Sequence, residues 1–281
     1  MDKLIKEYSS VHFAHLEHIS KLSEVVDTLS ELSRQLDIDA ISSYLIPKIQ
    51  IDYLIRSSVE IINSLKICTV SKHFSSVEAL SRISLEMSVN LRLLIRDDVR
   101  DTSKSLVRSY LKSKESTIKK WLKFSEKEND KEAQACANTI LSSIYNLKKI
   151  IPWVEVHGKD TWPKTIRDKF TLVGEEGMYL TAFASASDSV HSLSEDIFNL
   201  TIIAVAYPED PAEHLDAINA EKASFSIYLY ILAISFYFNT LSALIDKFDL
   251  KVNEDEIEKC FKTLNAVKDI HHNDFNKYKI Y

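Results

Sequence analysis

Apolar residues recur at alternating steps of three and four along most of the chain, and this spacing places them on one face of an α-helix. The first run extends from Lys3 to about Leu36 and predicts one long amphipathic helix. A second helix is expected from Pro47 to about Cys68, because proline is favoured in the first turn of a helix. A third helix, ending at about Arg96, is apolar on most sides, which indicates a central position.

Capping residues mark where later helices begin. Ser75 and Glu78 have the spacing of a capping box and open the third helix. Asn129 and Asp130 restart the chain after the fourth helix, and Pro152 ends the fifth. Four of the later helices are predicted over about 102–127, 129–152, 163–172 and 175–190. Another is expected to follow a second capping box, formed by Ser192 and Glu195. The last two are expected from Asp210–Pro211 through 223–245 and from Asn253 to about His271.

Glycine is nearly absent: Gly158, Gly174 and Gly177 all lie in one irregular stretch at 152–177. Tight strand-to-strand turns and phosphate-cradling loops need glycine, because they use positive φ or a close backbone approach. The run NLTIIAVA fits a helix or a strand, since its β-branched residues favour a strand and its neighbours are helical. We predict an all-α fold, a bundle of about eight to ten helices. It forms a single domain over 1–281 that would divide, if anywhere, in the irregular stretch.

Residues 223–245 carry no charge, and this run of 23 residues is long enough to cross a bilayer. A lipid-facing helix gains nothing from a polar stripe, whereas a central helix of a soluble bundle can use one to meet polar groups on its neighbours. The pattern favours the bundle, so we expect no membrane span and a cytoplasmic protein. The stripe consists of Ser224, Tyr228, Ser235, Asn239, Ser242 and Asp246, at helical spacing.

The composition narrows the classes of function. Thirty-five lysines and arginines against 41 aspartates and glutamates give a net charge of −6, which argues against a surface devoted entirely to nucleic acid. Three widely spaced cysteines indicate neither disulfides nor a cysteine zinc site. His12, His15 and His18 lie three residues apart and spread over about 120° of a helix. His271 and His272 are adjacent and diverge. We therefore expect no metal and no cofactor.

Arg82, Glu86 and Asn90 recur every four residues on the third helix and stack along one face. A buried arginine is tolerated only when it is paired, and Glu86, four residues on, is its natural partner. One interpretation is an anion or substrate site. The other is an internal polar network that sets how the helices register, and both stay open at this point.

A second polar pattern follows the glycines, where Tyr179, Phe183, Ser187 and His191 also step by four. Tyrosine, serine and histidine together offer a proton donor, a hydroxyl and a general base. The spacing is not that of a hydrolase, because the chain has no G-x-S-x-G turn. His191 is either the acid or base of a site or a hydrogen-bonded histidine at a helix end.

The fourth helix is locally basic. Residues 100–127 hold nine basic side chains and three acidic ones, and Arg108 and Lys112 belong to a series at steps of four. Such a face can follow an RNA or DNA backbone. It can equally be a solvated face whose aromatic side chains point into the core. The interleaved aromatic residues are Tyr110, Trp121 and Phe124.

Four segments follow one another over about 75–195: the helix R-I-S-L-E-M-S-V-N-L, the basic helix with Tyr110, the run W-P-K-T-I-R, and the stretch that ends S-D-S-V-H. In this order they resemble an uncharacterised family of bacterial all-helical proteins of unknown function. The resemblance implies a role in phage defence, and no established activity. The polar signature that it implies is Arg82, Glu86, Tyr179, Ser187 and His191.

A looser resemblance is to the HEPN helical ribonucleases, which are all-α, often dimeric and common in toxins. Their nuclease motif is an arginine followed after four to six residues by a histidine. None of the nine histidines here has an arginine at that distance upstream. A nuclease of this type would need Arg82 or Arg167 beside His191 through space. The resemblance implies RNA as a ligand and a homodimer, although this chain lacks the nuclease motif.

Two functions are compatible with the sequence. In the first, an interhelical pocket binds a nucleotide or an RNA phosphate, and His191, Arg82 and Glu86 carry the chemistry. In the second, the protein is a non-enzymatic interaction module of a defence or stress system, its polar stripes are structural, and its partner is a protein of the same operon. The ligand-binding residues expected for the first function are Tyr179, Ser187, Asn90, Arg108 and Lys112.

Overall fold

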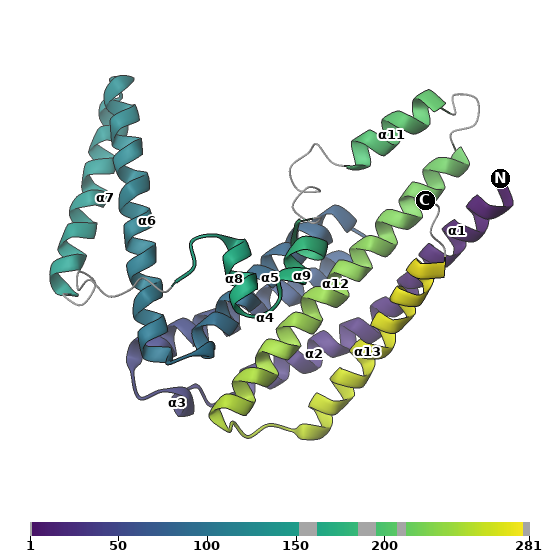
Figure 1. Ribbon diagram of the computed structural model, residues 1–281, viewed down its shortest axis with the longest axis horizontal. Helices are drawn as coiled ribbons and strands as arrows, with labels where there is room; N and C mark the ends of the chain where they lie inside the picture. Colours follow the sequence, from purple (N-terminus) through teal and green to yellow (C-terminus); the bar gives the residue numbers. More distant parts are fainter. Residues whose placement is uncertain (1, 152–161, 185–194, 207–211, 278–281) are drawn as a thin grey trace.

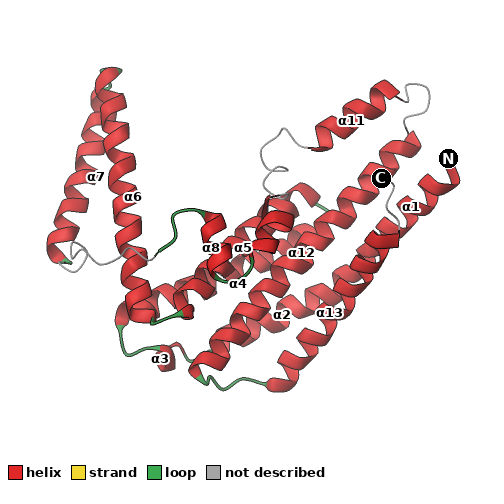
Figure 2. Cartoon of the chain, viewed as in Figure 1, coloured by secondary structure: helices red, strands yellow, loops and turns green. Residues whose placement is uncertain are grey.

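The structure is a computed structural model that describes residues 2–151, 162–184, 195–206 and 212–277 (Figure 1). All regular secondary structure in this part of the chain is helical, which confirms the predicted all-α bundle (Figure 2). The elements are α1 (Asp2–Ala14), the 3₁₀ helix η1 (His15–His18), α2 (Ile19–Gln35), α3 (Ile38–Ile41), α4 (Leu45–Val70), α5 (Phe74–Arg96), α6 (Val99–Lys127), α7 (Lys131–Ile150), α8 (Ile166–Leu172), α9 (Glu176–Met178), the π-helix η3 (Tyr179–Phe183), α11 (Glu195–Ala206), α12 (Ala212–Phe248) and α13 (Glu254–Lys277).

The central helix is α12, which packs against α5 and α1 (Figure 1). Its side chains are buried on most sides, among them Ile227, Ile234 and Leu241. Removal of this apolar area from water, worth about 25 cal/mol per Å², holds the helix in place. Within the described residues α12 is also the one helix long and apolar enough to cross a membrane, and most of its apolar window is buried inside the bundle. The expected absence of a membrane span stays a prediction.

The polar stripe of α12 meets polar neighbours over only part of its length. Ser224 Oγ lies 2.6 Å from His15 Nδ1, as the stripe predicts. Asn239 and Asp246, in contrast, are exposed to solvent. Tyr237, which lies outside the stripe, makes a buried contact with the N-terminal helices instead. Periodicity therefore identifies a polar face but not which of its residues find partners.

Capping residues are predicted correctly at α7 and wrongly at α5. The Asp130 carboxylate accepts a hydrogen bond from a backbone N–H in the first turn of α7, at 3.0 Å. The capping box of Ser75 and Glu78 does not form, because α5 begins at Phe74 without a side-chain cap. Glu78 is instead buried and accepts a hydrogen bond from Ser226 Oγ of α12, at 2.8 Å. Tertiary packing overrides the local signal there.

Four other stretches differ from the prediction. The helix expected over 3–36 is divided by the turn η1, and α3 was not expected. Helix α8 begins at Ile166, where Thr165 and Asp168 form a capping box. The helix expected over 175–190 starts with α9 and continues as a π-helix, and its later part lies outside the described residues. The run NLTIIAVA is helical, as part of α11.

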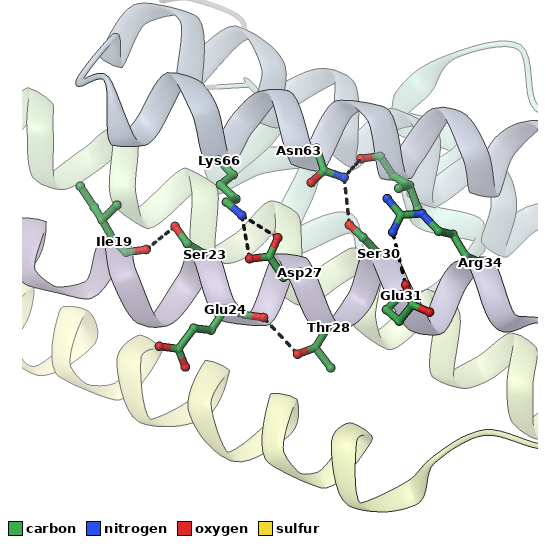
Figure 3. A network of polar contacts seen from close by, with 11 residues as sticks. Ile19, Ser23, Glu24, Asp27, Thr28, Ser30, Glu31, Arg34, Asn63 and Lys66 are labelled. Atoms are coloured by element: carbon green, nitrogen blue, oxygen red, sulfur yellow. Dashed lines mark hydrogen bonds and ion pairs between the residues drawn. The ribbon is translucent and has the colours of Figure 1, made fainter.

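Helices α2 and α4 are joined by polar contacts along their shared edge (Figure 3). The Lys66 ammonium donates to both carboxylate oxygens of Asp27, at 2.5 and 2.7 Å. Asn63 donates its amide to Ser30 Oγ at 2.9 Å. Exposed ion pairs of this kind contribute about 0–1 kcal/mol each. They orient the two helices, whereas the apolar core supplies most of the stability.

Helices α6 and α7 form a hairpin that projects away from the remaining helices (Figures 1 and 2). Its apolar core is small and separate from the main one, and consists of Ile118, Ala137 and Leu141 with flanking residues. Glu115 ties the two helices together, since its carboxylate accepts hydrogen bonds from Lys119 and, at 2.6 Å, from Lys148 of α7. These bonds lower the pKa of Glu115 to about 2. The hairpin therefore has its own packing and its own ion-pair network.

Removal of the Ser33 hydroxyl is expected to destabilise the fold. Ser33 Oγ and Tyr237 OH lie 2.7 Å apart in the core. A Ser33→Ala substitution leaves the tyrosine hydroxyl buried without that partner, which costs about 1–3 kcal/mol. Urea unfolding of Ser33→Ala, Tyr237→Phe and the double variant measures the coupling. Fully additive single effects would contradict this account, because they would show no interaction between the two hydroxyls.

Candidate functional site

Arg82 and Tyr179 lie close together, on α5 and η3, and the ring of Phe183 joins them. The guanidinium carbon of Arg82 is 5.0 Å from the centroid of that ring. The Tyr179 ring stacks on the same ring, with centroids 5.7 Å apart. The buried Nε of Arg82 has no hydrogen-bond acceptor among the described residues. Ser187 and His191 lie outside the described residues, so their part of the predicted site stays a prediction.

The predicted ion pair of Arg82 with Glu86 is wrong. The Glu86 carboxylate instead lies 3.9 Å from the ammonium of Lys169 on α8. Burial lowers the pKa of Lys169, and the nearby Glu86 opposes that shift. The Lys169 side chain is largely buried, and its ammonium therefore gains from a neighbouring carboxylate. Asn90 Oδ1 is buried with no donor in the described part of the chain. This face of α5 is therefore a contact surface for α8 and η3.

A cavity of about 310 Å³ lies where α5 ends, against α8 and α12, and its cations are already engaged. Lys247 Nζ donates to backbone carbonyls at the end of α5, including that of Asp97 at 2.6 Å. These are carbonyls that a helix end leaves without intrahelical partners. Arg96 donates to the Asp97 carboxylate, and Arg92 lies 3.6 Å from Glu175. The cavity is lined by Arg92, Ile95, Arg96, Leu172, Val173, Ala243 and Lys247.

The positive charge of the protein is concentrated on the α6–α7 hairpin. Residues 100–149 hold twelve lysines and arginines against six acidic residues, a net charge of +6. The rest of the chain then carries −12, since the whole chain carries −6. Of the two predicted ligand-binding residues here, Lys112 is exposed and Arg108 is half-buried. Both lie on α6, whereas Arg82 and Tyr179 lie on α5 and η3.

Tyr110 and Phe124 of α6 are largely exposed and do not point into the core, whereas Trp121 is only partly exposed. Tyr110 and Phe124 each expose 61% of their surface, and Trp121 exposes 37%. At about 100° per residue, the three fall within about 60° of one another around the helix. Exposed aromatic side chains on a basic helix are a surface for stacking rather than for packing.

Lysines lie beside these aromatic residues on a face without acidic side chains. By the same helical geometry, Tyr110, Lys120, Lys123, Phe124 and Lys127 share an arc of about 140°, which we name the outer face of α6. The acidic residues of α6 gather within about 40° on the opposite side. All five outer-face residues are exposed, and Lys127 has a 3.9 Å pair with Glu128 just beyond the helix. The outer face therefore presents cations and rings together.

A cluster of four buried histidines was not predicted. His12, His15, His18 and His271 each expose 8% of their surface or less. His15 forms a hydrogen-bonded chain with α12 and α13, in which Nδ1 lies 2.6 Å from Ser224 Oγ and Nε2 lies 3.1 Å from Asp274 Oδ2. The available signal was the apolar seam of the first helices, in which His15 holds a core position. Its hydrogen-bond partner on α13, Asp274, is 259 residues away and could not be paired with it from sequence.

The chain Ser224–His15–Asp274 has the connectivity of a hydrolytic triad without the surroundings of one. Ser224 is buried within α12, whose backbone N–H groups are used in the helix and supply no oxyanion hole. The ring of His271 covers that of His15, with centroids 3.8 Å apart. Within the described residues, no group of three or more histidine, cysteine or acidic side chains is arranged to hold a metal ion. The histidine cluster is therefore a buried polar connection between helices.

The comparison with known families finds a match over much of the chain. The family described as a family of unknown function, DUF5677, matches residues 51–202, more than half of the chain. The chain belongs to the DUF5677 family. Membership confirms the resemblance to an all-helical family of unknown function, and the match extends beyond 75–195 at both ends. Neither a curated protein nor a solved structure matches the chain.

The DUF5677 segment contains some of these features and not others. It covers most of α4, the whole of α5, the α6–α7 hairpin, α8 and η3, and part of α11. The outer face of α6 therefore belongs to the DUF5677 segment, and so does the face of α5 on which Arg82 lies. The central helix α12 and the histidine cluster lie outside it. A function carried by the hairpin would be a function of the family segment itself.

Proposed function

We propose that this DUF5677 protein binds single-stranded RNA on the outer face of α6. The observation that carries the proposal is the separation of charge, with +6 on the projecting hairpin and −12 on the rest of the chain. Lysines attract the phosphate backbone, and the acidic body repels it, so binding is directed to the hairpin. The proposal places the RNA on an open surface of the hairpin rather than in the expected pocket at Arg82.

The aromatic residues favour a single strand over a duplex. Bases of a single strand can stack on exposed rings, whereas the bases of a duplex are already stacked and paired. Tyr110 and Phe124 are fourteen residues apart, which is about 21 Å along a helix. At about 3.4 Å per nucleotide, this distance accommodates about six nucleotides. Lys120 and Lys123 lie between the two rings along the helix and can meet the phosphates.

Charge reversal on the outer face is expected to abolish most of the RNA binding. For Lys120→Glu with Lys123→Glu, we expect the affinity for a fluorescent oligouridylate to fall about tenfold or more. The slope of log affinity against log salt should lessen by about 1.4, since each phosphate contact on a single strand contributes about 0.7. Fluorescence anisotropy at several salt concentrations measures both quantities.

A matched control is available outside the hairpin, at the connection between α12 and α13 and on α13 itself. Lys251→Glu with Lys259→Glu makes the same change in net charge at two exposed positions. This variant should keep the wild-type affinity and salt slope to within about a factor of three, because its charges lie off the proposed surface. An equal loss in both variants would show a nonspecific charge effect, and the absence of RNA binding by the wild-type protein would end the proposal. Tyr110→Ala with Phe124→Ala separates stacking from charge, because it should lower affinity without changing the salt slope.

A second function, a protein-interaction module, is favoured by α11. This helix carries no charge between Ile197 and Ala206, and Phe198 and Val205 are among its exposed apolar side chains. Exposed apolar surface of this kind is typical of protein contacts. The roles in phage defence, as a homodimer or with a partner protein of the same operon, rest on the family resemblances. The lysine variant distinguishes the two functions, because it changes the hairpin and leaves α11 intact.

A further inference from the structure

Histidines occupy the end of an apolar seam between the N-terminal helices and α13. On α13 the buried positions step by four, three and four, and the last of them is a histidine rather than an apolar residue. The same change occurs on the facing segment, where two histidines precede the buried Leu22. The seam residues are Cys260, Leu264, Val267 and His271 on α13, and Leu22, His18 and His15 on the facing segment.

The rings are in contact with one another. The His271 ring lies 3.8 Å from that of His15 and 5.4 Å from that of His18, between centroids. The ring of His12 lies next in the row, tilted against that of His15 with centroids 5.9 Å apart. On the α12 side the ring of Tyr228 lies 6.4 Å from His271. Three helical segments, α1–η1, α12 and α13, therefore meet through imidazole rings at this end of the bundle.

The two hydrogen bonds of His15 can both form when its ring is neutral. A carboxylate only accepts, so His15 Nε2 carries the proton that is donated to Asp274, and Nδ1 accepts from the Ser224 hydroxyl. The buried Nε2 of His271 has no partner among the described residues. A proton added to His271 would place a cation against His15 with no acceptor free, because Asp274 already serves His15.

The charged groups around the cluster do not offset such a cation. Glu17 and Lys21 flank His18 with opposite charges, and Asp274 is the carboxylate contributed by α13. The α12 side contributes Tyr228, a neutral phenol whose pKa burial raises. Burial and the neighbouring imidazoles lower the pKa of His271 to about 2. Burial likewise lowers the pKa of His15 and of His18.

We propose that the histidine cluster is a proton-sensitive latch, which releases the last turns of α13 from α1–η1 and α12 in mild acid while the central helices stay folded. The cluster lies at the end of the seam, so opening it separates few apolar contacts. Among the described residues, the buried histidines all lie on α1, η1 and α13, so the contact of α5 with α12 contains no buried histidine. Release would expose the apolar edge of α13 and the rings of the cluster.

Hydrogen–deuterium exchange of the full chain tests the latch, with rates normalised for the intrinsic effect of pH. At about pH 7.5, peptides covering 268–277 should be protected; at about pH 5 they should exchange near their intrinsic rate, while α5 keeps protection of about 100-fold or more. In His271→Leu, whose side chain continues the apolar seam, peptides from the end of α13 should stay protected at both values. The exposed neighbour offers a matched control, since His272→Leu should behave like the wild-type protein.

Three results would overturn the proposal. The first is protection of the end of α13 at about pH 5 in the wild-type protein, and the second is its loss together with that of α5, which would be global unfolding. Persistence of the acid response in the folded His271→Leu variant would also count against the latch. If that variant does not fold, His271→Gln takes its place, because glutamine is polar yet does not bind a proton in this range.

Discussion

Replacement of Phe236 by alanine is expected to lower the free energy of unfolding by about 3–5 kcal/mol, the range for a buried aromatic residue. Phe236 is fully buried on α12. The ring of Phe170 on α8 stacks on it, with centroids 6.0 Å apart, and the Arg92 guanidinium lies 5.9 Å from the ring centroid. Truncation therefore leaves a cavity under two other elements, which a helical bundle cannot close without moving α8.

Urea unfolding followed by circular dichroism measures this loss. Phe198→Ala is the matched control, because Phe198 exposes 63% of its surface on α11. We expect the control to change the free energy of unfolding by less than about 0.5 kcal/mol, as is usual for exposed positions. Equal midpoints for the two variants would show that α12 does not hold the central position that the fold assigns to it.

Acidification from about pH 7 to about pH 5 is expected to lower the free energy of unfolding by about 2 kcal/mol through His271 alone. The pKa of His271 falls to about 2 in the folded protein, from about 6.5 in an unfolded chain. With the cluster closed, the folded state holds this imidazole neutral, and below about pH 6.5 a state in which His271 is exposed binds the additional proton. Stability is fully present above that pH and is lost as the pH falls, by about 1.4 kcal/mol per unit.

His15 and His18 add to this loss, because burial lowers the pKa of each in the same direction. Glu115 does not contribute to the change between pH 7 and 5. Its lowered pKa stabilises the folded state, and this stabilisation is lost only below the ordinary carboxyl range. Unfolding free energies at three pH values, for the wild-type protein and for His271→Leu, measure the effect. The variant should show a shallower dependence. A wild-type stability that stays constant or rises toward pH 5 would contradict the buried, neutral state of the cluster.

The two proposals concern different parts of the chain and can fail independently. RNA binding rests on exposed charge in the DUF5677 segment and depends on salt. The latch rests on buried histidines outside that segment and depends on pH. The lysine variant should lose RNA binding and keep the same acid response at the end of α13 as the wild-type protein. The His271→Leu variant should in turn bind RNA like the wild-type protein at neutral pH.

The sequence by itself determined the helical architecture. Apolar spacing, scarce glycine and the Asp130 cap predicted an all-α fold, and α4, α5, α6 and α7 begin and end close to the predicted positions. Helix formation depends on residues three or four positions apart, and this information is present in any short window. The sequence also predicted the central position of α12, because a long uncharged and apolar run favours burial.

Only the tertiary structure decided which side chains meet. Glu78 had the local spacing of a cap but bonds to Ser226, and Glu86 was expected to meet Arg82 but lies beside Lys169. The ring of His271 lies on that of His15 from the far end of the chain. These choices depend on how helices cross and register, which is set by the packing of whole faces rather than by neighbours along one helix. For the same reason, the exposure of the α6 aromatic residues followed from the projection of the hairpin, which no local pattern encodes.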